Sequence, residues 1–239
     1  MRFIFLSAFV FFTNTIVGQI NLNKLKNAAT KAQSVINPKD LSQDEVVKGL
    51  KEALIVSITN SVANASDEGG FNNNLLIKIP FPEEAEKMKK ALQKVGMQSQ
   101  LNKFEYTLNE AAEDAASFAK EIFIHEVRNM LINEAMSILK GSDNAATTYL
   151  RNKTSKELYI KFKPVVKNSI EKANLQRYWR ILAERYNAIT LMEKVNTDLE
   201  DYVTNQAIDG LFVLIAEEEK NIRNNPKARV SKILQKVFK

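Results

Sequence analysis

The chain has 239 residues, seven glycines, five prolines and no cysteine, so disulfides and thiolate metal sites are excluded. Its net charge of +6 is compatible with anionic partners, but solvated helix faces explain it equally well. The scarcity of glycine and proline, together with abundant Lys, Glu, Ala and Leu, predicts an all-α protein.

Residues 1–18 have the pattern of a secretory signal peptide. Arg2 precedes an apolar run over residues 3–12, and the small residue Gly18 follows it. A membrane anchor is the weaker alternative, because the run is shorter than the roughly 20 residues that a bilayer requires. We expect cleavage near Gly18 and a periplasmic mature protein, with association with the cell envelope as a further option. No cysteine follows the run, so a lipoprotein anchor is excluded.

Residues 19–40 form a basic amphipathic segment, and residues 227–239 have the same character at the other end of the chain. Either segment can lie on an anionic membrane surface. The alternative, which we favour for the C-terminal segment, is docking on the protein with the lysines facing outward.

A helical domain is expected over residues 41–239. Its first helix begins with a capping box formed by Ser42 and Glu45. Apolar residues then recur every three or four positions, as one buried face requires: Val47, Leu50, Leu54, Ile58 and Val62.

A polar loop over residues 67–74 separates this helix from an apolar segment, residues 75–82. Pro80 and Pro82 keep the residues before them out of the helical conformation, so the segment is expected to be an extended strap across the bundle. Pro82 then starts a short helix, which Gly96 ends.

The longest predicted helix comes next, and Gly141 ends this region. It carries a seam spaced by three and four residues: Leu108, Ala111, Ala115, Phe118, Ile122 and His125. Because His125 lies on this seam, we expect it in the core or lining a groove.

Residues 141–162 concentrate polar residues that are typical of helix ends. Asp143 or Asn144 caps a short helix that runs through Arg151, and a second capping box, Thr154 with Glu157, restarts the helix. Pro164 is expected to kink or break this second helix.

Two more long helices are predicted, one carrying Leu175 to Tyr186 and one running from about Thr197 to Asn224. Gly210 inside the second indicates a close helix crossing or a break, since glycine destabilises a helix by about 1 kcal/mol. Asn225 and Pro226 cap a terminal helix. No linker separates these elements, so we predict a single compact multi-helix bundle.

Known catalytic and metal-binding patterns do not fit this sequence. The chain has one histidine, and the position four residues after it is Asn129, so neither a zinc-protease motif nor a di-iron bundle can be assembled. Nucleophile-elbow, phosphate-loop and dinucleotide patterns are missing as well. We therefore expect no cofactor and no metal. Residues 177–180 mix arginine with aromatic residues, but the expected export argues against nucleic acid as a partner.

Three carboxylates, Glu113, Glu134 and Asp209, fall within or beside apolar helix faces, where an unpaired charge is costly. The arginines that can pair with them are Arg151, Arg223 and Arg229. If the groups converge, they form either a buried ion network or a polar ligand pocket, and Arg151→Ala would then lower stability by about 3 kcal/mol. Arg223 has an ordinary surface alternative, because Glu219 lies four residues before it.

Several stretches share the motifs of one bacterial family, among them "LNEAAEDAA", "ILKGSDNAATTYLR" and "DGLFVLIAEEEKNIRNNPKAR". In this order they resemble the family designated domain of unknown function 4197, from about Leu41 to Phe238. The resemblance implies an exported helical domain and carries no established activity.

The charge pattern and these motifs together give our candidates for a polar network or ligand site. They are Asn109, Glu113, Glu134, Asp143, Thr147, Arg151, Asp209, Glu219, Arg223 and Arg229. We expect a non-enzymatic module that binds a protein partner, or an apolar (lipid-like) or anionic ligand, in a groove between helices, with peripheral membrane contact as a further option. The alternatives are a hydrolase that uses Glu113 or Asp209, and a structural envelope protein attached by its amphipathic ends.

Overall fold

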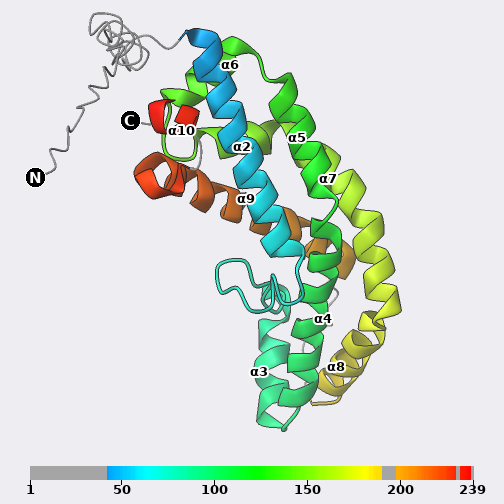
Figure 1. Cartoon of the computed structure of the whole chain (residues 1–239). Coiled ribbons are helices and arrows are strands. Elements are labelled where there is room, and N and C mark those ends of the chain that lie inside the picture. The colour runs from blue at the N-terminus through cyan, green and yellow to red at the C-terminus, as the bar shows by residue number, and fades with distance from the viewer. Residues whose placement is uncertain (1–41, 190–197, 230–231, 238–239) are drawn as a thin grey trace, which may run out of the picture. The chain divides into compact units, whose positions relative to one another are not determined.

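The computed structural model describes residues 42–189, 198–229 and 232–237, all within one compact unit that starts at Leu41 (Figure 1). Helices are the only regular secondary structure in these three ranges, which confirms the predicted all-α class. The expected signal peptide, the basic segment 19–40 and Phe238 lie outside them. No helix within the described ranges is both long and apolar enough to cross a membrane.

As far as Ile189, the helices follow one another through short connections, except for the loop between the first two. They are α2 (Gln43–Ser66), η1 (Glu83–Ala85), α3 (Glu86–Lys94), α4 (Gln98–Ala116), α5 (Ala119–Asn129), α6 (Ile132–Leu139), α7 (Ala145–Lys172), α8 (Leu175–Ile189), α9 (Leu199–Asn224), η2 (Pro226–Ala228) and α10 (Lys232–Val237).

Helix α9 is the centre of the packing, because it contacts α2, α4 and α7, and α4 also packs on α7 (Figure 1). Phe123 of α5 meets Phe212 of α9 edge to face in this core. Helices α3 and α8 pack against each other and against α4. A second aromatic cluster joins α8 to α4, in which Trp179 stacks on Phe104, and Phe81, from the segment before η1, contacts both.

Several predicted helix ends are confirmed. Ser42 and Glu45 form the capping box of α2, with the Ser42 amide donating to Glu45 Oε2 at 2.9 Å. Gly96, just after α3, has a φ of 82°, a conformation that favours glycine. The Asn225 side chain accepts the Lys227 amide and so caps η2.

The predicted strap is only partly extended. Residues 75–77 form a turn, whereas residues 78–82 run without helix or strand and bury Ile79 and Phe81. Leu75 and Leu76, which we expected within the apolar strap, are exposed instead. The turn causes this, because it points both side chains away from the bundle.

Gly210 marks a close approach, but neither the predicted helix crossing nor the predicted break is found there. A Cβ atom there would lie 2.7 Å from Cε1 of Phe71 and 3.2 Å from Cβ of Ile77. The neighbour is therefore the loop between α2 and α3 rather than another helix, and α9 runs through Gly210 without a break.

The predicted seam is wrong at Phe118 and His125, although Ile122 is buried as expected. Helix α4 ends at Ala116 and α5 begins at Ala119, so the chain between them does not continue one helix. Phe118 and His125 are consequently exposed, whereas Leu108, Ala111 and Ala115 are buried as expected. His125 Nε2 lies 2.9 Å from Nδ2 of Asn129 in the next turn.

The predicted helix restart at Thr154 is also wrong. Helix α7 is continuous from Ala145 to Lys172 and includes Pro164, so that proline does not break it. Thr154 is buried and donates its hydroxyl to the Leu150 carbonyl at 2.7 Å. This bond within the helix satisfies the hydroxyl that a capping box would otherwise have used.

Candidate functional site

The candidate polar residues form several separate contacts. One of the buried contacts is the pair Glu219 and Arg223 on α9, whose side chains are 4% and 9% exposed. Glu219 accepts the Ala146 amide at 3.0 Å and the Thr147 amide at 2.9 Å, and also the Thr147 hydroxyl at 2.8 Å. Arg223 donates to Glu219 at 2.9 Å and to the Ile138 carbonyl at 2.9 Å.

This pair joins the end of α6 to the start of α7. Helix N-termini have unpaired amides and favour negative charge, and helix C-termini have unpaired carbonyls and favour positive charge. Glu219 supplies the negative charge at the start of α7, and Arg223 supplies the positive charge at the end of α6. The alternative of a surface pair is therefore wrong, because the turn between α6 and α7 covers both side chains.

Arg229 caps the end of α9. Its Nε donates to the Ile222 carbonyl at 3.0 Å and its Nη2 donates to the Arg223 carbonyl at 2.8 Å. The structure gives no carboxylate partner for Arg229 among the described residues. We expected Arg229 to form an ion pair with a carboxylate, but its guanidinium donates to backbone carbonyls instead.

Glu113 holds the loop between α2 and α3. Its buried carboxylate accepts backbone N–H groups of Gly69 at 3.1 Å, Phe71 at 3.0 Å and Asn72 at 3.2 Å. These amides take the place of the arginine that we expected. Three backbone donors satisfy this buried carboxylate, so its hydrogen bonds are used by the fold.

Asn109, one turn before Glu113 on α4, holds the strap. Its Oδ1 accepts the Ile79 amide at 2.8 Å and its Nδ2 donates to the Ile79 carbonyl at 3.0 Å. The amide side chain thereby pairs with Ile79 as a neighbouring strand would. This contact explains how a single extended segment is buried without a sheet.

Arg151 and Asp209 form a surface pair. Their side chains are 43% and 54% exposed, and the Arg151 guanidinium lies 4.4 Å from the centre of the Phe212 ring. The expected loss of about 3 kcal/mol on removing Arg151 assumed a buried ion pair. That assumption is wrong, because α7 and α9 present these two residues at the edge of their contact.

Glu134 lies beside Tyr149 and Lys153 in a small polar group between α6 and α7. The Tyr149 hydroxyl is 2.9 Å from Glu126 and 3.1 Å from Glu134. Burial, followed by hydrogen bonds to the two carboxylates, raises the pKa of Tyr149, so its hydroxyl stays protonated at neutral pH. The amide of Leu131 donates to Glu134 and lowers the pKa of Glu134. Asp143, the remaining candidate, is 3.4 Å from the Asn224 amide group.

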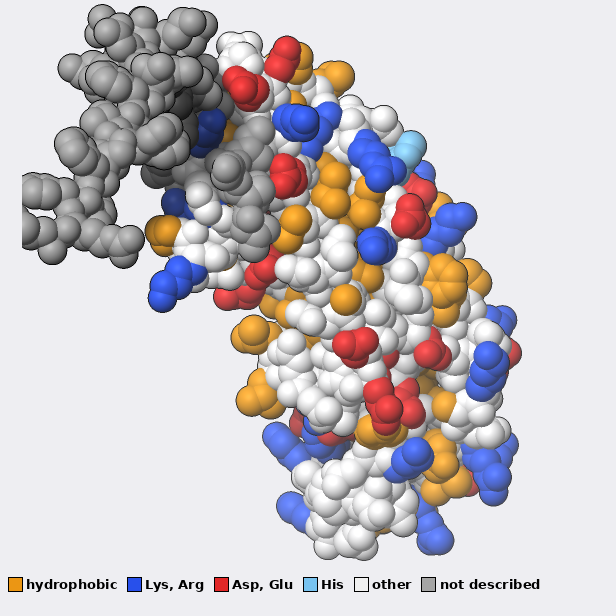
Figure 2. Space-filling view, viewed as in Figure 1, with side chains coloured by type: hydrophobic (Ala, Val, Ile, Leu, Met, Phe, Trp, Pro, Cys, Tyr) orange, Lys and Arg blue, Asp and Glu red, His pale blue; other side chains and the backbone are white. Residues whose placement is uncertain are grey.

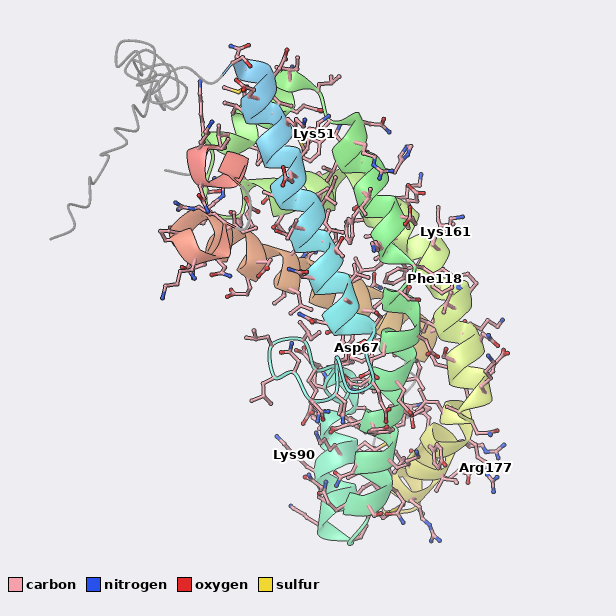
Figure 3. The ribbon with its side chains drawn as sticks, in the orientation of Figure 1. Lys51, Asp67, Lys90, Phe118, Lys161 and Arg177 are labelled. Atoms are coloured by element: carbon pink, nitrogen blue, oxygen red, sulfur yellow. The ribbon has the colours of Figure 1, made fainter. Side chains whose placement is uncertain are left out.

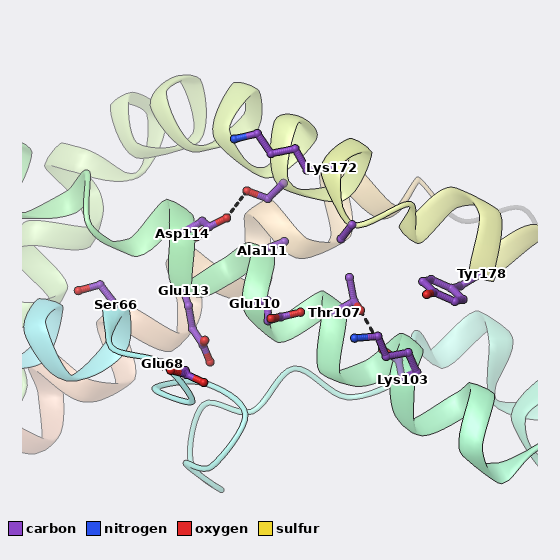
Figure 4. A pocket seen from close by; sticks show the side chains of 12 residues that line it. Ser66, Glu68, Lys103, Thr107, Glu110, Ala111, Glu113, Asp114, Lys172 and Tyr178 are labelled. Atoms are coloured by element: carbon purple, nitrogen blue, oxygen red, sulfur yellow. Dashed lines mark hydrogen bonds between the residues drawn. The ribbon is translucent and has the colours of Figure 1, made fainter.

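A groove of about 640 Å³ lies beside Glu113, and we call it the α4–α7 groove (Figure 4). It is lined by Ser66, Glu68, Lys103, Thr107, Glu110, Ala111, Glu113, Asp114, Ser169, Lys172, Ala173 and Tyr178. The four carboxylates outnumber the two lysines. The negative charge of Glu110, together with burial and the charge of Glu68, raises the pKa of Tyr106 nearby. The lining of the groove therefore has more acidic than basic side chains.

The sequence prediction missed most residues of this groove. Lys103, Thr107, Glu110 and Asp114 recur every three or four positions, so the periodicity used for apolar residues would have placed them on one face of α4. That signal is ambiguous, because a polar stripe is usually a solvated helix face.

A second groove of about 610 Å³ lies between α6 and α7 and includes Glu134, Tyr149 and Lys153. These three already contact one another, with Lys153 Nζ 3.2 Å from Glu134. In the α4–α7 groove, by contrast, Glu68 and Lys172 make no hydrogen bond or ion pair with any described residue. No group of His, Asp or Glu side chains in the described ranges is arranged to hold a metal ion.

The two arginine contacts should differ in their effect on stability. Arg223→Ala should lower the free energy of unfolding by about 3 kcal/mol, because it leaves a buried carboxylate without its cation. Arg151→Ala should cost about 1 kcal/mol or less, because its ion pair with Asp209 is exposed to solvent. Urea unfolding of both variants measures the difference. Equal losses, or a larger loss for Arg151→Ala, would contradict this assignment.

Comparison with known proteins places the chain in a family. A family model described as Protein of unknown function (DUF4197) matches residues 40–239. No curated protein and no solved structure matches the chain. The family match includes the α4–α7 groove and both ends of the Glu219 and Arg223 contact. Because it spans more than half of the sequence, the chain belongs to this family of unknown function.

Proposed function

We propose that the protein is a non-enzymatic binding module that holds a basic segment of a partner protein in the α4–α7 groove. The observation that carries this proposal is the charge of the groove, which is lined by four carboxylates and two lysines. Backbone amides engage Glu113 and the Ser169 hydroxyl engages Asp114, which leaves Glu68 and Glu110 for a ligand. Carboxylates that are not consumed by the fold, such as Glu68, can pair with lysine or arginine side chains of a ligand.

The dimensions of the groove support a peptide ligand. Its volume of about 640 Å³ lies in the range of known ligand sites, which is about 300–1,000 Å³. Tyr178 lies at the end of the groove formed by α8 (Figure 4), where an aromatic ring can contact a cationic side chain. An anionic ligand, which the sequence analysis also allowed, would meet the carboxylates instead.

The hydrolase alternative has less support. Of the two carboxylates named for it, Glu113 is engaged by three backbone amides and Asp209 is exposed beside Arg151. A general acid or base needs access to a substrate proton. The positions of both carboxylates are explained by their contacts within the protein, with no catalytic role required.

Neutralising the groove should weaken binding of a fluorescent oligolysine peptide. The double variant Glu68→Gln/Glu110→Gln should bind about tenfold more weakly than the unmodified protein in fluorescence anisotropy, because two screened ion pairs of about 0.7 kcal/mol each give that factor. Glu121→Gln/Glu157→Gln removes the same charge from exposed positions outside the groove and should bind almost normally. If both double variants bound the peptide equally weakly, the net charge of the protein alone would explain the effect, and the groove would not be the binding site.

We also propose that the protein is exported to the periplasm. The support is the pattern of residues 1–18, where Arg2 precedes an apolar run. Mass spectrometry of the protein isolated from a periplasmic fraction should find Gln19 at its N-terminus. Recovery of the chain with Met1 in place, or only in the cytoplasmic fraction, would contradict export.

A further inference from the structure

The loop between α2 and α3 exposes two adjacent leucines. Leu75 is 93% exposed and Leu76 is 64% exposed, although the neighbouring residues Phe71 and Ile77 are buried. Side chains of this size are usually covered in a folded protein, and adjacent exposed ones mark contact sites more often than isolated ones do.

The backbone holds both leucines outward. Asn74 Oδ1 accepts the Leu76 amide at 3.0 Å, and the Asn74 carbonyl accepts the amides of Ile77 at 3.1 Å and Lys78 at 2.8 Å. These bonds form a tight turn with the leucines at its tip.

The two ends of the loop are also held in place. Glu113 binds three amides before the turn, and Asn109 binds Ile79 after it. Because both ends are fastened to α4, the leucines cannot turn inward without breaking buried hydrogen bonds. The exposed position is therefore built into the fold.

Four exposed lysines follow this projection in the chain. Lys78 directly follows the turn, and Lys87, Lys90 and Lys94 lie on one face of α3, at intervals of three and four residues. All four are exposed. Lys90 points to the side of the molecule where the loop projects (Figure 3), and the space-filling view shows apolar side chains above basic ones along that edge (Figure 2). The acidic residues of this segment, Glu83, Glu84 and Glu86, lie at or just before the start of α3.

We propose that Leu75, Leu76, Lys78 and the α3 lysines form a docking surface for an anionic lipid bilayer. The leucines enter the boundary between headgroups and acyl chains, and the lysines contact lipid phosphates. Long lysine side chains can reach the headgroups while their stems lie against the membrane surface. This surface is separate from the α4–α7 groove, so either proposal can fail without the other.

The shape of the surface favours a membrane over a protein partner. A stable protein interface buries about 800 Å² on each side and is centred on well-packed pockets. Two leucines at the tip of a narrow turn form a projection instead of a pocket. A projection of this kind inserts readily into a fluid bilayer, whose lipids rearrange around it, and the positive charges beside it complement anionic headgroups.

A fluorescent label at the turn tests insertion directly. The chain has no cysteine, so Leu75→Cys can be labelled at a single position in the full chain with an environment-sensitive dye. Ile132→Cys is the matched control, because Ile132 belongs to another exposed apolar pair, with Leu131 61% and Ile132 50% exposed. We expect vesicles containing phosphatidylglycerol to raise the emission and shift it to shorter wavelength at position 75 but not at position 132.

Two results would overturn the proposal. One is unchanged emission at position 75 with anionic vesicles, which would leave a protein partner as the occupant of the surface. The other is an equal change at both positions, which would indicate nonspecific adsorption. Replacing Lys87, Lys90 and Lys94 with glutamine should reduce the response at position 75 about tenfold or more, since each lysine near an anionic surface contributes measurably to attraction. An unchanged response in that variant would also contradict the proposed lysine contacts.

Discussion

Buried backbone amides and carbonyls must find hydrogen-bond partners, and in this protein a few distant side chains supply them where helices end. Glu219 and Arg223 satisfy the start of α7 and the end of α6, and Glu113 satisfies the loop after α2. Asn109 does the same for the strap. Each side chain comes from a helix that already packs in the core, so the non-helical segments are held by the bundle itself.

This use of polar residues decides where function can be sought. A buried glutamate or arginine in a helical protein resembles part of a catalytic site, but here its hydrogen bonds are used by the fold. Two surfaces that the fold leaves open are the α4–α7 groove and the projecting turn at Leu75 and Leu76. Both depend on Glu113, because the loop that it fastens carries Glu68 into the groove and the leucines to the surface. A single buried carboxylate thus positions both proposed binding regions.

Local signals in the sequence were sufficient for much of the fold. The capping box at Ser42 and the glycine at Gly96 placed helix ends correctly, since each acts through bonds within a few residues. The break at Ser117 carries no glycine or proline and could not be seen. Glu113 was predicted to lie on an apolar helix face, and Glu219 was named only as a candidate and as a surface partner of Arg223. The partners of both include backbone amides, which a sequence of residue types does not show. Matching acidic with basic residues in the sequence therefore predicted an arginine partner for Glu113, which the structure does not show.

Amide hydrogen exchange tests the central claim most directly, because it reports hydrogen bonds at single backbone positions. The amides of Phe71, Asn72, Ala146 and Thr147 should exchange as slowly as those in the middle of α4, although Phe71 and Asn72 lie in a loop. In Glu113→Ala the protection of Phe71 and Asn72 should be lost while that of Ala146 and Thr147 remains. Rapid exchange of Phe71 and Asn72 in the unmodified protein would contradict the account.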